Sequence, residues 1–158
     1  MHPQIEAIFD EAESRYLKSE ELDVLNQYVE TLPIRLETYR RLRDEELAVM
    51  QQVADQLQAE LPQEKIANLE RSIKNALLML RYCAMAMLLN DESVVHERLL
   101  SWLRQNVQTY STQTIDVVLY RLLNQRLSQT LSLQQMNLFS PLLKLAQSEL
   151  LNSSSAAI

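Results

Sequence analysis

The sequence contains no glycine and only four prolines in 158 residues. The phosphate-binding loops of nucleotide-binding folds require glycine, so the P-loop and the dinucleotide fingerprint are both excluded. Hairpin turns of the Asn-Gly kind are excluded as well. We therefore expect an all-α protein. The length predicts a single domain over residues 1–152, followed by a disordered tail at 153–158.

Charge and residue types exclude several classes of function. The net charge of −6 disfavours a dedicated nucleic-acid-binding protein. One cysteine and two histidines provide neither a disulfide framework nor a zinc site, so we expect no metal. No side chains stand in a catalytic arrangement, so we expect no enzyme. We see no signal peptide, and the apolar stretch 76–89 is short and interrupted by Arg81, which predicts a soluble intracellular protein.

Apolar residues recur at helical spacing along nearly the whole chain. This periodicity predicts seven helices of unequal length, near residues 3–14, 19–32, 34–60, 64–89, 93–109, 112–130 and 133–151. Pro33 is expected to break or kink the chain between the second and third helices. Ser19 is expected to cap the second helix, and Ser132 with Gln135 predicts a capping box for the last. Short loops around one long apolar helix are typical of globin-type packing.

Three segments of the chain resemble one known family, in the order in which that family has them. The stretch LRYCAMAMLLNDESVVHERLLSWLR, residues 80–104, is similar to a family segment that begins LRYVTYA and continues through GD, SVLDER and GLRE. The stretches RYLKSEELDVLNQYVETLPIRLE and VMQQVADQLQAELPQ are similar to two further segments. The chain thus resembles the phycobiliproteins, the globin-like antenna subunits of cyanobacterial phycobilisomes. The resemblance covers residues 5–131 and implies a globin-like fold with an N-terminal helix pair, near residues 3–32, used for association.

The chain departs from this family where the pigment is attached. The family links a linear tetrapyrrole through a thioether to the cysteine of a C-x-R-D motif, ten residues before the Tyr of LRY. Counting back from Tyr82, the resemblance places Ser72 at the cysteine, Lys74 at the arginine and Asn75 at the aspartate. A serine hydroxyl cannot replace the thiolate nucleophile, so we expect no covalent cofactor. A non-covalent bilin near Arg71, Lys74 and Asn75 is the alternative.

The resemblance also implies an interface between subunits. In the family, an Asp on the first helix of one subunit pairs with the Arg of LRY on its partner, and Glu11 and Arg81 fall on these two positions. An ion pair within the chain is the alternative for Arg81. The apolar part of the interface would come from Ile5, Phe9, Leu22 and Tyr28, with packing inside their own domain as the alternative.

Three further features have structural interpretations. Cys83 is expected to be a small buried hydrophobic residue, and Trp102 is expected to pack in the core. A charged segment is expected to form a solvated face in which acids at 44–46 pair with arginines one turn away. Its arginines are Arg35, Arg40, Arg41 and Arg43.

We therefore predict a non-catalytic, phycobiliprotein-like protein of the cyanobacterial photosynthetic apparatus. It would act through association in the structure, assembly or regulation of a phycobilisome or photosystem. We expect its partner to be a second copy, a phycobiliprotein-like chain or another component of a photosynthetic complex. Its location would be the cytoplasm, or thylakoids reached through partners. The alternatives are a non-covalent tetrapyrrole carrier or sensor, and a globin-like sensory domain unrelated to light harvesting.

Overall fold

The computed structural model describes residues 2–152, which form helices and short connections without a strand. The all-α prediction is confirmed, and the tail predicted at 153–158 lies outside the described residues. The helices are α1 (Pro3–Ala12), α2 (Ser19–Glu60), α3 (Ile66–Leu89), the π-helix η1 (Val95–Leu100), α4 (Ser101–Tyr110), α5 (Gln113–Thr130) and α6 (Leu133–Asn152).

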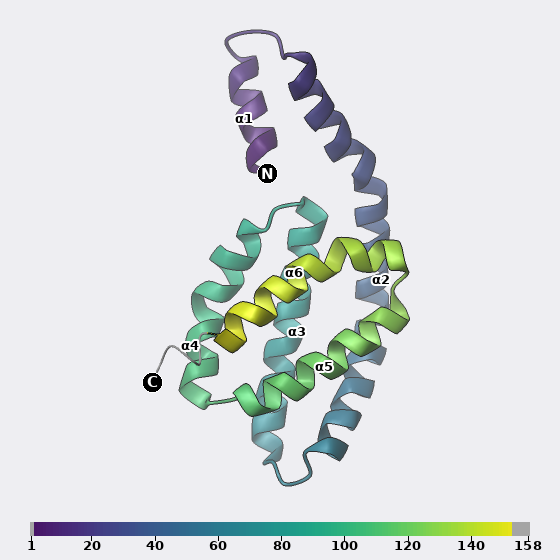
Figure 1. Cartoon of the computed structure of the whole chain (residues 1–158), viewed down its shortest axis with the longest axis vertical. Helices are drawn as coiled ribbons and strands as arrows, with labels where there is room; N and C mark the ends of the chain where they lie inside the picture. Colours follow the sequence, from purple (N-terminus) through teal and green to yellow (C-terminus); the bar gives the residue numbers. More distant parts are fainter. Residues whose placement is uncertain (1, 153–158) are drawn as a thin grey trace.

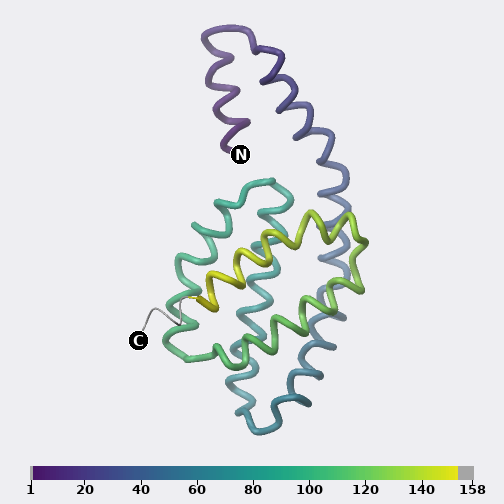
Figure 2. Tube along the Cα trace, in the orientation of Figure 1, coloured from purple at the N-terminus to yellow at the C-terminus, as the bar shows by residue number. Residues whose placement is uncertain are grey.

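The helices form a body and a projection (Figures 1 and 2). The projection is the N-terminal hairpin, residues 3–32, in which α1 folds back along the first part of α2. In the body, α3 runs through the middle, and α2, α5 and α6 pack against it. A larger share of residues is therefore exposed in the hairpin than in the helices that enclose the core.

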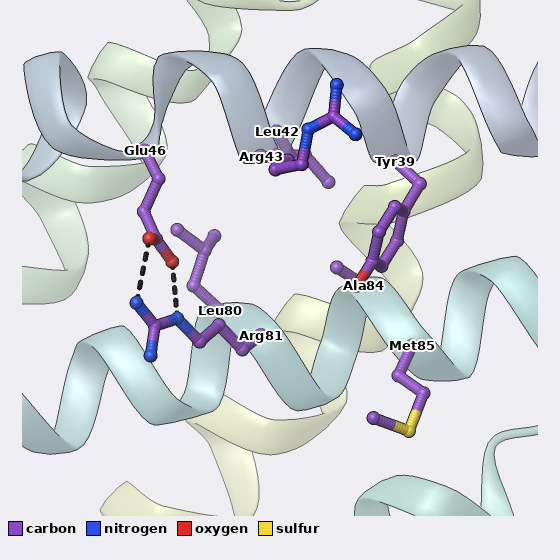
Figure 3. A pocket seen from close by; sticks show the side chains of 8 residues that line it. All are labelled: Tyr39, Leu42, Arg43, Glu46, Leu80, Arg81, Ala84 and Met85. Carbon is purple, nitrogen blue, oxygen red and sulfur yellow. Dashed lines mark hydrogen bonds and ion pairs between the residues drawn. The ribbon is translucent and has the colours of Figure 1, made fainter.

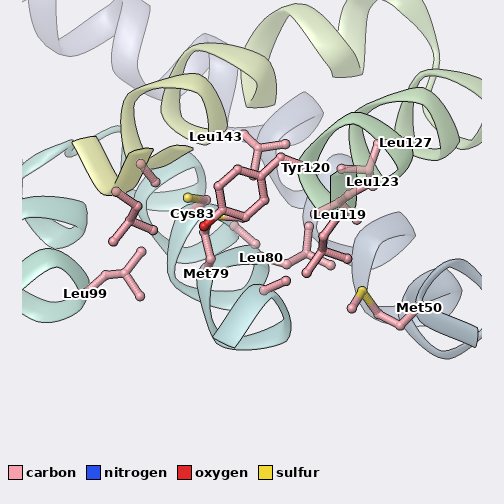
Figure 4. Close-up of a cluster of buried hydrophobic side chains, with 14 of the residues drawn as sticks. Met50, Met79, Leu80, Cys83, Leu99, Leu119, Tyr120, Leu123, Leu127 and Leu143 are labelled. Atoms are coloured by element: carbon pink, nitrogen blue, oxygen red, sulfur yellow. The ribbon is translucent and has the colours of Figure 1, made fainter. Parts of the chain in front are cut away.

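α3 supplies the centre of the hydrophobic core (Figure 4). Met79 and Cys83 are fully buried against Leu119 and Leu123 of α5, and each fully buried side chain of this size contributes about 1.5–3 kcal/mol. Of the helices that the structure describes, α3 alone is long and apolar enough to cross a membrane. Core helices share that property, and 44% of its apolar window is buried inside the protein.

α2 is one continuous helix of 42 residues that passes through Pro33. The predicted break between two helices is therefore wrong. Proline removes the hydrogen bond to the carbonyl four residues before it, which here belongs to Val29. Pro33 and Val29 are both exposed, so water can satisfy that carbonyl.

Arg35 lies on the face of α2 opposite Pro33 and connects α2 to α3. It was expected on a solvated face. Its side chain is 2% exposed, so that expectation is wrong. Its Nη2 donates to the carbonyl of Tyr28 at 2.6 Å, and its Nη1 donates to the carbonyl of Leu88 in the last turn of α3. The guanidinium also lies over the Tyr28 ring, 4.6 Å from its centroid. Arg35 thus joins α2 to α3 where the hairpin leaves the body.

The predicted helix ends differ in their outcome. Ser132 and Gln135 form the predicted capping box, with reciprocal hydrogen bonds of 3.0 and 3.1 Å. Ser19 does not cap α2, because the helix already begins at Ser19 and Lys18 is its N-cap residue. The Glu21 carboxylate takes the capping role by accepting from the Lys18 N–H at 2.7 Å.

The helix predicted near 93–109 starts as the π-helix η1 and continues as α4. Two side chains at the start of α4 donate to carbonyls of this π-helix: Ser101 to the Glu97 carbonyl and the Trp102 indole N–H to the Arg98 carbonyl, both at 2.7 Å. This bond holds Trp102 at the surface, with 38% exposure, so the predicted core position is wrong.

Candidate functional site

Large apolar side chains are exposed along the N-terminal hairpin. Phe9 is 53% exposed on α1 and Val29 is 56% exposed on α2. The full exposed set of the hairpin is Phe9, Tyr16, Leu22, Val24 and Val29. Exposed apolar side chains that gather on one projecting element are typical of an interaction surface.

The other apolar residues predicted for the interface have a different place. Ile5 is buried within the chain, so it holds α1 onto its own hairpin. Tyr28 is half-buried between the His2 ring, 5.9 Å away, and the Arg35 guanidinium. Of the four predicted apolar residues, Phe9 and Leu22 are thus the two that face solvent.

Charges at the tip of the hairpin pair with one another. Arg15 binds Glu21 through two hydrogen bonds of 2.7 and 3.0 Å, and it lies 3.3 Å from the Glu11 carboxylate. The hydrogen bonds from Arg15 and from the Lys18 N–H lower the pKa of Glu21 to about 2. The Glu11 side chain is exposed, and within its own chain it shares Arg15 with Glu21.

Arg81 lies in a groove between α2 and α3 (Figure 3). Its Nε and Nη2 donate to the two carboxylate oxygens of Glu46 at 2.7 and 2.9 Å. Within one chain Arg81 pairs with Glu46 and Glu11 pairs with Arg15, so the structure does not pair Arg81 with Glu11. The groove has a volume of about 360 Å³, and its lining residues are Tyr39, Leu42, Arg43, Glu46, Leu80, Arg81, Ala84 and Met85.

Ser72, at the family's attachment position, points into the core. It is 1% exposed, and its hydroxyl lies near the buried carboxyl of Asp116 on α5 without a hydrogen bond to any described group. Burial raises the pKa of Asp116, although the Thr112 hydroxyl donates to it at 2.7 Å. Burial, together with the charge of Asp116, also raises the pKa of Tyr120. A buried polar cluster thus surrounds the position that would need to carry a reactive thiol.

The neighbours of Ser72 line a separate open groove between α3 and α4. Lys74 and Asn75 lie on its α3 side, and Asn75 donates to Asn106 of α4 at 2.9 Å. Arg71 covers the ring of Tyr110, 3.8 Å from its centroid. Trp102 belongs to the rim as well, and the volume is about 570 Å³. This size is within the range of small-molecule sites.

The single cysteine does not line this groove. Cys83 is fully buried and donates weakly to the Leu142 carbonyl at 3.7 Å, as predicted for a core residue. Burial raises the pKa of its thiol to about 12, which suppresses the nucleophilic thiolate. Among the residues that the structure describes, no group of His, Cys, Asp or Glu side chains could hold a metal ion.

Two residues of the site, Glu46 as the partner of Arg81 and Asp116 beside Ser72, were not predicted from the sequence. The acids of residues 44–46 were expected to pair along their own helix, and Glu45 does so with Arg41 at 3.2 Å. Glu46 and Arg81 are 35 residues apart and lie on different helices, so helical spacing gives no signal for their pairing. Asp116 stands four residues after Thr112, and that spacing was a usable signal for a side-chain bond in the first turn of α5.

Comparison with known proteins agrees with this arrangement. A family model described as phycobilisome protein matches residues 8–150. The chain belongs to the phycobilisome protein family. Members of that family are structural light-harvesting proteins with a globin-like all-α fold, and phycobiliproteins normally carry bilin chromophores. The resemblance to phycobiliproteins is thus confirmed, whereas a search of curated proteins found no match.

Proposed function

We propose that this phycobilisome-family protein is a non-catalytic association subunit without a covalent bilin. It would act in the structure, assembly or regulation of a cyanobacterial phycobilisome or photosystem, in the cytoplasm or at thylakoids through partners. The observation that carries the proposal is the projecting hairpin with its exposed apolar side chains, Phe9 and Leu22 among them. The serine at the attachment position, buried beside Asp116, supports the loss of pigment chemistry.

A second copy of the chain fits this surface. α1 carries Glu6, Asp10 and Glu11 and no basic residue, so it is an acidic helix with an exposed phenylalanine. The groove between α2 and α3 offers an apolar floor with Arg81 at its edge. Complementary charge on two faces of one chain favours a twofold dimer in which each α1 lies against the partner's groove. In this arrangement Glu11 would approach Arg81 of the other copy.

Arg81→Glu should weaken the dimer. Each dimer would contain two contacts between Arg81 and an acidic helix, and charge reversal turns both attractions into repulsions. We expect the dimer dissociation constant to rise about 30-fold at low salt, measured by sedimentation equilibrium.

Arg121→Glu is the matched control for this experiment. Arg121 is 55% exposed where Arg81 is 57% exposed, and it also pairs with a glutamate of its own chain, Glu60. The control should leave the dissociation constant unchanged. Equal effects of both substitutions, or no effect of Arg81→Glu, would remove this groove from the interface.

The groove between α3 and α4 favours a second candidate function, non-covalent binding of a bilin. Lys74 would meet a propionate, and the aromatic rings of Trp102 and Tyr110 would contact the tetrapyrrole. Arg71 is less available because it stacks on Tyr110. The bilin itself would supply light absorption.

Absorption spectra separate the two candidates. The protein would be produced in a host that also makes phycocyanobilin, and its visible spectrum recorded before and after denaturation in acid urea. The association function predicts no visible band. A band that leaves with free pigment after denaturation would establish a non-covalent site, and Lys74→Glu should then weaken that band.

A further inference from the structure

The proposed interface contains an ion pair within one chain, between Arg81 and Glu46, whose role in association is not yet assigned. A carboxylate can bind a guanidinium in two bidentate ways, through Nε and one Nη or through both Nη atoms. Glu46 occupies the first of these, so the partner's acid can reach only the outer Nη edge of Arg81. Among the described residues, Nη1 of Arg81 has no hydrogen-bond partner.

The two members of the pair differ in their exposure to water. The Arg81 side chain is 57% exposed, whereas the Glu46 side chain is 22% exposed. Solvent screens the field of a half-buried charge less than that of an exposed one. A second carboxylate arriving at Arg81 therefore meets a cation whose charge is largely cancelled, together with repulsion from Glu46 a few ångströms away.

The other cation of the groove is also paired within the chain. Arg43 Nε donates to the Asp44 carboxylate at 2.8 Å. Both arginines that line the groove thus have an acidic partner in their own chain, and that partner raises the pKa of each. In the free subunit the groove therefore attracts an acidic helix much less than its two arginines alone would suggest.

We propose that Glu46 is an internal competitor of the partner's acidic helix for Arg81, and that it sets how tightly two copies associate. This inference rests on the proposed association through the groove between α2 and α3. Docking of α1 requires the partner's carboxylate either to share Arg81 with Glu46 or to displace it. A subunit with this competitor associates weakly and reversibly, and it discriminates against partners that offer only a single acid.

Glu46→Gln tests the proposal. Glutamine keeps the size of the side chain and its hydrogen-bonding oxygen and removes its charge, so a large effect on folding is not expected, since Arg81 is more than half exposed. Because a twofold dimer contains the pair twice, we expect the dissociation constant to fall about tenfold at low salt. Sedimentation equilibrium on the full chain measures this constant, and a thermal melt of each variant confirms that it is folded.

Glu45→Gln is the matched control. Glu45 is the adjacent residue and pairs with Arg41 on its own helix, away from Arg81. It changes the net charge by the same amount, so a general effect of charge on association would appear in both variants. The proposal requires tightening in Glu46→Gln alone, and requires Arg81→Glu to abolish that gain in the double variant.

The outcomes separate this inference from the proposed function. If Arg81→Glu weakens the dimer while Glu46→Gln leaves it unchanged or weakens it, association through the groove stands and the competitor role is overturned. Weakening by Glu46→Gln would instead make Glu46 a positioning residue for Arg81. If Arg81→Glu has no effect, or if neither the natural chain nor Glu46→Gln associates, both proposals fail.

Discussion

Replacing Arg35 by alanine should lower the free energy of unfolding by about 3 kcal/mol. The guanidinium is 2% exposed and donates to the carbonyls of Tyr28 and Leu88 and, at 3.3 Å, to the Thr31 hydroxyl. Truncation removes the donor to the Leu88 carbonyl at the end of α3 and opens a cavity, and an unsatisfied buried group costs about 1–3 kcal/mol. Urea unfolding followed by circular dichroism measures the loss.

Two further variants make this result specific. Arg40→Ala removes an exposed arginine from the same helix, and we expect it to change stability by less than about 0.5 kcal/mol. Arg35→Met restores most of the volume without the donors, so it should recover only the part of the loss that comes from packing. A loss below about 1 kcal/mol in Arg35→Ala would contradict the proposed joint between α2 and α3.

A cysteine placed at position 72 should be almost unreactive in the folded protein. Ser72 is 1% exposed and lies beside the Asp116 carboxyl, so a thiol there would be shielded from reagents and disfavoured as a thiolate. We expect Ser72→Cys to react with a maleimide at least about a hundredfold more slowly than Lys74→Cys, because reaction must wait for local opening. Mass spectrometry of timed samples gives both rates.

The comparison is cleanest in a Cys83→Ala background, where the added thiol is the only one in the chain. Lys74 is exposed and lines the open groove, so its cysteine variant reports reagent access to that surface. Both variants should react at equal rates in urea. Fast reaction of Ser72→Cys in the native protein would mean that one substitution brings back a reachable attachment position.

The helices could be predicted from the sequence because each depends on local spacing. The same is true of the Ser132 capping box, whose two partners are three residues apart. Pro33 could not be interpreted correctly, since the outcome depends on whether the carbonyl of Val29 faces water. Arg35 belonged by sequence to a charged cluster, and only its approach to Leu88, 53 residues away, shows that it is buried.

In the candidate site too, local motifs indicated some residues, whereas contacts between distant helices could not be predicted. The family resemblance indicated which residues to examine, Glu11, Ser72 and Arg81 among them, because it depends on local motifs. It did not indicate that Ser72 faces Asp116 or that Arg81 binds Glu46, since both contacts join helices far apart in sequence. Trp102 was misplaced because the π turn before it changes which face of α4 it occupies.

The unbroken length of α2 gives the hairpin a mechanical property. At ~1.5 Å per residue its 42 residues form a rod of roughly 63 Å. The segment from Arg35 to the start of the helix acts as a lever arm of roughly 24 Å, so a rotation of about 5° at its base moves the tip by roughly 2 Å. The angle at which the hairpin would meet another molecule is therefore set at its base, where Arg35 ties α2 to the last turn of α3.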